Sequence, residues 1–187
     1  MARLIYAGLM SLDGYIADRD GNFNWAEPDA EVHSFVNELQ RQAGTYLLGR
    51  RMYEVLAVWD HPEEFGEIPD YVRDYAELWR ASDKVVFSRT LQDVTTTRTR
   101  IEREFSAGAV GRLKADAGRD LTIGGAELAA EAIRAGLVDE FQMFLTPVAV
   151  GGGKSFLPDN IRLQLELLEE RRFGNGTVFL RYANRTA

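Results

Sequence analysis

Mainly apolar runs alternate with amphipathic stretches along most of the chain. Five runs have the length of buried β-strands, and they span residues 4–10, 45–48, 84–87, 121–123 and 140–148. Between them, apolar residues recur with helical spacing over residues 32–43, 51–59, 71–79 and 126–135. Weaker patterns predict a short strand over 94–97 and one more helix through Ile101, Phe105 and Leu113. Residues 11–27 are rich in Gly, Asp and Asn and are expected to form a long loop.

The last part of the chain alternates instead. Leu163, Leu165 and Leu167 are separated by polar residues, which predicts a strand over 162–173 with one face in water. Glycines at 174 and 176 favour a tight turn, and 177–183 is the expected partner strand. The pattern therefore predicts an α/β fold with a mostly parallel central sheet, an antiparallel C-terminal hairpin and helices on both faces. No linker or repeat divides it, so we expect one domain over residues 1–187.

Composition narrows the function classes. The 22 Lys and Arg residues against 29 Asp and Glu give a net charge of −7, which argues against a general nucleic-acid binder. Cysteine is absent, which excludes thiol catalysis and thiolate metal sites, and two histidines are a poor basis for a zinc site, so no metal is expected. No 18 consecutive residues are apolar, so we expect no membrane span, and the lack of cysteine fits a cytoplasmic location.

Three turns that follow predicted strands have the character of anion sites. They are Gly49-Arg50-Arg51, Ser88-Arg89 and Gly124-Gly125-Ala126. Free N–H groups at a helix start bind phosphate, and ligands of open α/β sheets gather at the carboxyl ends of the strands. Each turn alone is a weak signal, because a glycine between a strand and a helix more often forms an ordinary connection. Together they indicate a ligand with several phosphates.

A fourth glycine-rich segment resembles the end of a nucleotide-binding P-loop. It reads Gly151-Gly-Gly-Lys154-Ser155. A P-loop needs another glycine where Val148 stands, and it must open a helix, whereas Phe156 and Pro158 follow here. We therefore interpret it as a glycine-rich turn after a strand.

Five motifs occur in the order found in the dihydrofolate-reductase-like family. They are Met10–Ala17, Leu48–Glu54, Val86–Arg89, Leu121–Glu127 and Gly153–Pro158. The chain resembles this family over about residues 3–183, and it is most similar to the reductase domain of bacterial bifunctional riboflavin deaminase-reductases. The resemblance implies a dihydrofolate-reductase-like three-layer fold.

The resemblance also implies NADPH as cofactor. In the family, the first and third of the turns hold the pyrophosphate, Ser88 and Arg89 meet the adenosine 2′-phosphate, and the backbone near Ala7 and Ile16 flanks the nicotinamide. An unusual cis peptide between two glycines at the third turn is a further expectation. The implied cofactor-binding residues are Ala7, Ile16, Gly49, Arg50, Arg51, Ser88, Arg89, Ile123, Gly124, Gly125, Ala126 and Glu127.

The substrate side departs from folate reductases. Those enzymes place a carboxylate two residues after a proline at the start of the first helix, and here that position, after Pro28, is Ala30. Asp29 or Glu31 would reach the pocket with a one-residue slip, although acids in a first helical turn are also common for the dipole. This departure puts dihydrofolate in doubt. Asp13 is a further catalytic candidate.

Two further residues with ring side chains, Trp25 and His33, lie near or in the predicted first helix. Trp25, in the loop over the site, is expected either to pack as part of a lid or to stack on a flat substrate ring. His33 is expected on the helix surface.

We therefore expect an NADPH-dependent reductase that passes hydride to a small heterocycle. The resemblance implies the 5-amino-6-(5-phosphoribosylamino)uracil reductase reaction of riboflavin biosynthesis. Nothing in the chain matches the cysteines of the deaminase domain that accompanies this reductase, so a stand-alone reductase is expected. A dihydrofolate reductase and a non-catalytic NADPH-binding protein are the alternatives. Family members commonly dimerise, so a homodimer is expected.

Overall fold

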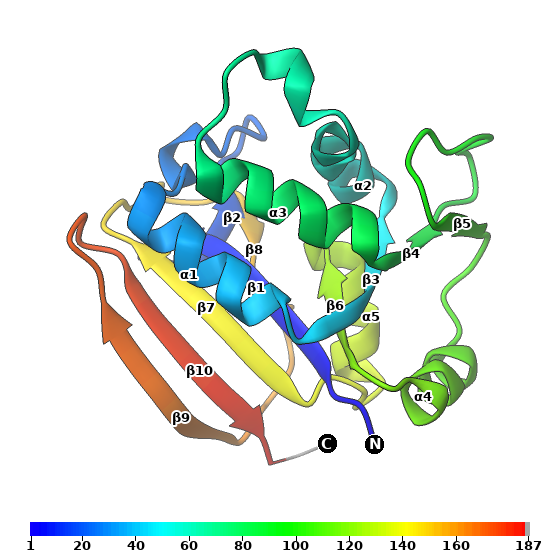
Figure 1. Cartoon of the computed structure of the whole chain (residues 1–187). Coiled ribbons are helices and arrows are strands. Elements are labelled where there is room, and N and C mark those ends of the chain that lie inside the picture. Colours follow the sequence, from blue (N-terminus) through cyan, green and yellow to red (C-terminus); the bar gives the residue numbers. More distant parts are fainter. Residues whose placement is uncertain (186–187) are drawn as a thin grey trace.

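The protein, described by a computed structural model over residues 1–185 without the side chain of Phe65, is built around one twisted sheet (Figure 1). The strands are β1 (Leu4–Ser11), β2 (Tyr15–Ala17), β3 (Ala43–Gly49), β4 (Asp83–Phe87), β5 (Thr99–Glu102), β6 (Asp120–Gly124), β7 (Glu140–Thr146), β8 (Lys154–Ser155), β9 (Leu165–Arg172) and β10 (Val178–Asn184). The α-helices are α1 (Ala30–Gln40), α2 (Arg50–Leu56), α3 (Asp70–Ala81), α4 (Ala107–Asp116) and α5 (Ala126–Arg134). Short 3-10 turns span Asn24–Ala26, Ala57–Asp60 and Pro62–Phe65.

Strand order explains how distant segments meet. The main sheet runs β5-β4-β3-β6-β1-β7-β10-β9. Its first six strands pair in parallel, and β10 pairs antiparallel with both β7 and β9. The α/β class, the mostly parallel sheet and the antiparallel C-terminal hairpin are thus confirmed. Because β1, β3, β4 and β6 are parallel, their carboxyl ends share one edge of the sheet.

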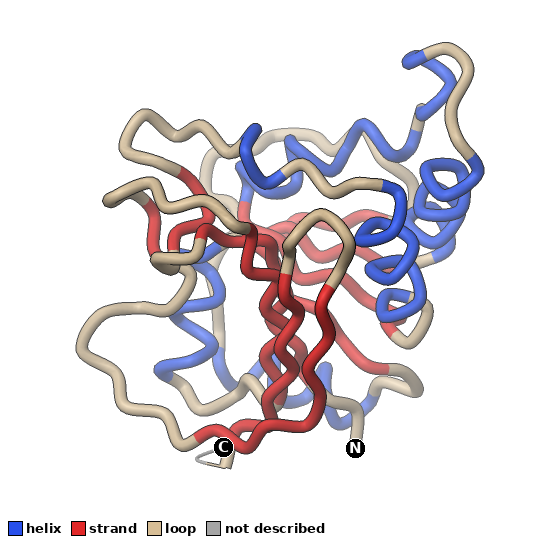
Figure 2. The backbone as a smooth tube through the Cα atoms, turned by 90° about the vertical axis from the view of Figure 1, so that its left-hand side faces the viewer, coloured by secondary structure: helices blue, strands red, loops and turns tan. Residues whose placement is uncertain are grey.

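Helices cover both faces of this sheet, which gives the predicted three layers (Figure 2). On one face, Ala129, Ala132 and Ile133 of α5 pack in the largest core cluster. On the other face, Val32 of α1 packs with phenylalanines of β7 and β10, and Trp79 of α3 packs on β3 and β4. Among the helices of the described residues, none is long and apolar enough to cross a membrane.

Several predicted element boundaries are wrong, for local reasons. Ala43, placed in the first helix, begins β3, because the helix ends at Gln40. The strand predicted at 94–97 is irregular, since these residues hydrogen-bond to side chains, as in Thr97 N to Asp60 Oδ2 at 3.0 Å. The strand lies instead at β5 and contains Ile101, which was assigned to a helix.

The helix that follows starts later than its apolar pattern suggested. Ser106 accepts a hydrogen bond from Ala109 N and caps α4, so Phe105 stays outside the helix and packs on Phe87. In the C-terminal hairpin, residues 162–164 stay outside β9, which begins at Leu165. The expected cis peptide is also wrong: every peptide of the described chain is trans, and Gly125 instead takes a φ of 96°.

Candidate functional site

A cavity of about 1710 Å³ opens at the carboxyl ends of the parallel strands and continues inward between α1 and α3. Residues of β1, β3, β6 and β7 form its floor, and β2 and β8 lie over its outer part. Ligands of parallel α/β sheets bind at this edge, because the strand ends and the helix starts present backbone groups there.

Two of the predicted anion turns meet at this edge. Leu48 of β3 is in register with Gly124 of β6, so the turns after these strands are neighbours. A methyl group built on Gly125 would lie 3.8 Å from Gly49 N and 3.9 Å from Gly49 Cα. The positive φ of Gly125 requires glycine, and it directs the chain into α5, whose first N–H groups have no intrahelical partner. The two turns together form one cradle for an anion.

The remaining predicted turn, Ser88-Arg89 after β4, is held in shape by its own polar groups. Ser88 Oγ accepts hydrogen bonds from Thr90 N at 3.3 Å and Leu91 N at 3.0 Å. Arg103 donates to Ser88 O at 3.2 Å and to Leu91 O at 2.5 Å. The Ser88 hydroxyl therefore shapes the turn, while Arg89 remains largely exposed beside the cavity.

Arg50 connects this turn to the glycine cradle. Its guanidinium donates to Thr90 Oγ1 at 2.8 Å and to Glu54 Oε1 at 2.7 Å. Arg50, Arg51, Arg89 and Arg103 all line the cavity. Four guanidinium groups in the same cavity as a glycine cradle are suited to a ligand that carries several phosphates.

Lys154 adds a cation that the sequence did not assign to the site. Its Nζ lies 2.6 Å from Glu127 Oε1 in the first turn of α5, and both residues line the cavity. The hydrogen bond and the charge of Lys154 lower the pKa of Glu127. Lys154 belongs to the segment that resembles a P-loop. The sequence showed this motif, but it did not indicate that the segment packs against α5.

The segment over the outer cavity, which we term the lid, consists of β2, β8 and residues 150–153. Asp13 secures it, because its carboxylate accepts hydrogen bonds from Val150 N at 3.1 Å and Gly151 N at 2.7 Å. A hydrogen bond from Ser11, together with these N–H groups, lowers the pKa of Asp13. Gly153 is pressed against β2, since a Cβ there would lie 2.0 Å from Ala17 O. Asp13 thus holds the lid and is absent from the cavity lining.

All the residues expected to bind the cofactor line this cavity. They are Ala7, Ile16, Gly49, Arg50, Arg51, Ser88, Arg89, Ile123, Gly124, Gly125, Ala126 and Glu127. The structure brings them together from β1, β3 and β6, the turn after β4, the starts of α2 and α5, and the lid. Asp13, Trp25, Asp29 and Glu31, expected on the substrate side, do not line it. The indole N–H of Trp25 is buried without a hydrogen-bond partner.

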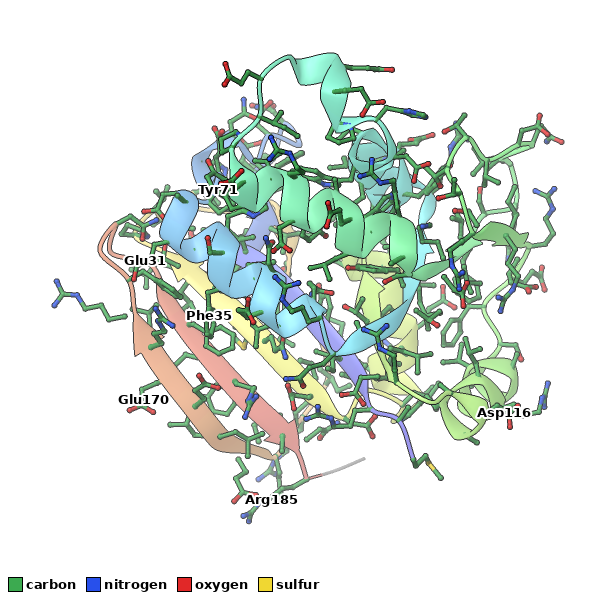
Figure 3. The ribbon with its side chains drawn as sticks, viewed as in Figure 1. Glu31, Phe35, Tyr71, Asp116, Glu170 and Arg185 are labelled. Carbon is green, nitrogen blue, oxygen red and sulfur yellow. The ribbon has the colours of Figure 1, made fainter. Side chains whose placement is uncertain are left out.

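The two acids at the start of α1 have structural partners instead. Asp29 is the N-cap of α1, and its Oδ1 accepts a hydrogen bond from Val32 N at 2.9 Å. Glu31 reaches the C-terminal hairpin, where its Oε2 accepts from Gly174 N at 3.0 Å and its Oε1 lies 3.5 Å from Arg171 (Figure 3). Ala30, at the position of the folate reductases' acid, offers no carboxylate. No acid of α1 therefore lines the inner cavity.

The inner end of the cavity, between α1 and α3, is aromatic and polar. His33, Gln40, Tyr46, Trp59 and Tyr75 line it, and we call this part the inner chamber. The His33 ring lies 5.8 Å from Trp59 and 5.6 Å from Tyr75, between ring centroids. The expectation of a surface His33 is thus wrong, because α3 packs over this face of α1.

A match to a protein-family model shows which family the chain belongs to. Residues 2–179 match the family described as RibD C-terminal domain. The chain is 31% identical to the uncharacterized protein YyaP of Bacillus subtilis (strain 168). The match extends over 184 residues and covers 96% of this chain and 94% of the relative.

Solved structures show the same fold. A putative riboflavin biosynthesis protein from Shewanella sp. PV-4 superposes with a TM-score of 0.75 at 20% identity, covering 99% of both chains. RibD of Acinetobacter baumannii superposes with a TM-score of 0.72 at 15% identity, covering 98% of this chain and 58% of that one. At these identities the likeness shows the fold alone.

Proposed function

Because this chain belongs to the RibD C-terminal domain family, a family of riboflavin-biosynthesis reductases, we propose that it is an NADPH-dependent reductase acting on a small heterocycle. The reaction type is that of the 5-amino-6-(5-phosphoribosylamino)uracil reductases. The bifunctional deaminase/reductase of Thermotoga maritima, a solved relative in fold, carries this activity in its name.

The observation that carries the proposal is the cradle that Gly49 and Gly125 form beside a group of cations. Backbone N–H groups at the start of α5 suit the pyrophosphate. Arg50 and Arg51 follow Gly49 directly, and Arg89 with Arg103 lies at the neighbouring strand end, where a third phosphate distinguishes NADPH from NADH. The donor set of the cavity thus fits a dinucleotide with three phosphates.

Each part of the chain has its own task in this proposal. Bound NADPH supplies the hydride, and the protein supplies orientation and electrostatics. Ala7 and Ile16 line the cavity between the cradle and the inner chamber, which suits the backbone contacts expected for the nicotinamide. The lid, held by Asp13, lies over the outer part of this cavity. The inner chamber receives the substrate ring.

The two alternatives have less support. A dihydrofolate reductase needs a carboxylate at the pterin, and Asp29 and Glu31 are both bonded elsewhere. A non-catalytic NADPH-binding protein would keep the cradle without turnover. We further propose that the chain acts as a homodimer in the cytoplasm.

Two measurements test the function in sequence. Titration of the protein with NADPH, followed by nucleotide fluorescence, is expected to show saturable binding that is tighter than binding of NADH. NADPH oxidation is then followed by absorbance with a panel of reducible pyrimidines, pterins and quinones. Absence of NADPH binding would refute the proposal, whereas tight binding without oxidation of any panel member would favour the non-catalytic alternative.

A further inference from the structure

The proposed reduction needs a proton as well as a hydride. When hydride adds to the carbon of a C=N or C=O group, the electron pair of that bond moves to the nitrogen or oxygen, which then takes up a proton. Asp29 and Glu31 do not line the cavity, because Asp29 caps α1 and Glu31 binds Gly174. None of the five residues that define the inner chamber is an acid, and of these five only His33 exchanges a proton readily near neutral pH.

The imidazole of His33 is held in the wall of the chamber by aromatic rings. Its centroid lies 5.0 Å from that of Tyr71, 5.6 Å from that of Tyr75 and 5.8 Å from that of Trp59. His33 follows Ala30 by three residues, nearly one turn, so the two lie on the same side of α1. The ring is therefore fixed in orientation on the side of the helix where Ala30 offers no carboxylate.

Asn37 determines which ring nitrogen of His33 is available to a substrate. Asn37 is 1% exposed, and its Nδ2 donates to Tyr71 O and to Asp74 Oδ2, both at 2.8 Å. Both N–H groups of the amide are thus used, so its Oδ1 accepts the side-chain hydrogen bond that Asn37 shares with His33. His33 Nδ1 is buried and is the donor to Asn37, which leaves Nε2 for the cavity. Nδ1 therefore keeps its hydrogen, and the proton that is gained and lost belongs to Nε2.

The groups that face His33 from α3 do not compete for this proton near neutral pH. They are Tyr71, Tyr75 and Asp74. Burial raises the pKa of Tyr75 to about 12, and Asp74 is bound by Arg41 with two contacts of 2.8 Å. Burial lowers the pKa of His33, and the charge of Asp74 offsets this only in part. The imidazolium form of His33 thus releases its proton more readily than an exposed histidine does.

We propose that His33 is the general acid of the reduction and gives the proton of Nε2 to the substrate. The carbon of a substrate C=N or C=O group accepts the hydride of bound NADPH, and the electron pair of that bond takes the proton. A C–H bond and an N–H or O–H bond form, the Nε2–H bond breaks, and NADPH is oxidised to NADP⁺. Neutral His33 keeps its hydrogen bond to Asn37, and water in the open cavity returns a proton to Nε2. This inference rests on the proposed function, because it names the proton donor of the same site.

The pH dependence of the chemical step tests this role. Single-turnover reduction of 7,8-dihydrobiopterin, or of any other panel member that the protein reduces, is expected to slow as the pH rises from about 5 to 8, because only the imidazolium form donates. His33→Gln should lower this rate at least about 100-fold, abolish its pH dependence and leave NADPH affinity unchanged. His61→Gln, which replaces the exposed histidine paired with Glu63, is the matched control and keeps the wild-type profile.

Two further results separate proton donation from packing of the ring. Imidazole added to His33→Ala is expected to restore part of the rate, and the restored rate should again fall as the pH rises. A His33→Gln variant that keeps the wild-type pH profile would overturn the proposal. Glu27 is exposed and also lines the cavity, so loss of the pH dependence in Glu27→Gln and not in His33→Gln would overturn it as well.

Nitrogen NMR of the two histidine rings tests the same assignment without NADPH or substrate. His61→Gln removes one set of ring signals, so the other set belongs to His33. We expect Nδ1 of His33 to stay protonated while Nε2 titrates, with a pKa below the ordinary value of histidine. A neutral ring protonated at Nε2, or a ring that does not titrate, would overturn the proposal. If no panel member is reduced, the reductase proposal falls and takes the acid role with it, whereas normal reduction by His33→Gln removes the acid role alone.

Discussion

Lys154 Nζ lies 2.6 Å from Glu127 Oε1, so a cation of the lid meets an acid in the first turn of α5. This contact crosses the cavity beside the cradle proposed to hold the cofactor pyrophosphate. A carboxylate next to a pyrophosphate repels it, whereas an ammonium group attracts it. The two partners are therefore expected to affect cofactor binding in opposite directions.

Lys154→Gln is expected to weaken NADPH binding about tenfold or more, since a charge-assisted hydrogen bond contributes about 1.5–3 kcal/mol. Glu127→Gln is expected to leave affinity unchanged or to raise it, because it removes the competing acid. Calorimetric titration measures both. Arg73→Gln, which removes a charge from an exposed pair on α3, is the control. Equal losses in both site variants would mean that the pair only maintains the lid.

The arginines around the Ser88-Arg89 turn after β4 are expected to set the preference for NADPH over NADH. Arg50→Ala combined with Arg89→Ala should weaken NADPH binding by about 1.5–3 kcal/mol for each contact, and Arg89→Ala alone should barely change binding of NADH. Fluorescence titrations with the two nucleotides give this comparison directly. Arg134→Ala, at the far end of α5, is the control. If NADPH affinity survives the double substitution, the assignment of these arginines is wrong.

Asp29 is expected to contribute to stability and not to turnover. Asp29→Ala removes the cap of α1 and should lower the free energy of unfolding by about 1 kcal/mol, whereas Asp29→Asn retains a capping oxygen and should cost little. Both variants should keep kcat, as should Glu31→Gln, which weakens the contact with Gly174. Urea unfolding and steady-state rates measure the two effects. A large loss of kcat in a stable Asp29→Asn variant would mean that this carboxylate takes part in catalysis.

Lys84 makes stability depend on pH in the alkaline range. It is fully buried, its Nζ donates to Trp79 O and Ser82 O, and burial lowers its pKa from 10.5 to about 8. Between these values the unfolded chain binds more protons at this lysine than the folded chain, so the contribution of Lys84 to stability rises with pH. Relative to Lys84→Met, the wild type should gain on the order of 2 kcal/mol between pH 7.5 and 10.5. A constant difference in urea unfolding across this range would contradict the lowered pKa.

The exposed edge of the sheet is the expected site of dimerisation. β9 is the last strand of the sheet and carries Leu167 and Leu168, which are 49% and 44% exposed. An uncovered edge strand with exposed apolar side chains favours pairing with a second copy. Light scattering is expected to show a dimer, and Leu167→Glu with Leu168→Glu is expected to yield monomers of unchanged helix content. A wild type that is monomeric at micromolar concentration would exclude the dimer.

The glycine cradle could be predicted from the sequence because its signals are local. A glycine between a strand and a helix places backbone N–H groups at a strand end wherever the strand lies in the sheet, so Gly49 and Gly125 needed little tertiary information. The resemblance then suggested NADPH as the ligand that both turns would bind. Their contact with each other depends on β3 and β6 being neighbours, which alternation of apolar runs does not reveal.

The inner chamber could not be predicted in the same way, because long-range packing forms it. Asp29 and Glu31 are acids at the start of a helix, where a catalytic carboxylate could lie. In the structure, however, Asp29 accepts a hydrogen bond from Val32 N as the cap of α1, and Glu31 accepts one from Gly174 N in the β9–β10 turn. His33 is polar on a helix that shows an apolar face elsewhere, and only the aromatic residues of α3 and Trp59 place it at a cavity. Lys154 lies in the glycine-rich segment that is not a P-loop, yet its side chain lines the cavity.

The separation of the two halves has a consequence for how such chains diversify. The cradle is built into the ends of β3 and β6, whose residues also form the core, so few substitutions there are tolerated. Of the chamber side chains, His33 and Gln40 stand on α1 and Tyr75 stands on α3, and exchanging them leaves the sheet pairing untouched. Substitutions on α1 and α3 are therefore expected to change what the inner chamber accepts while the cradle between β3 and β6 is kept.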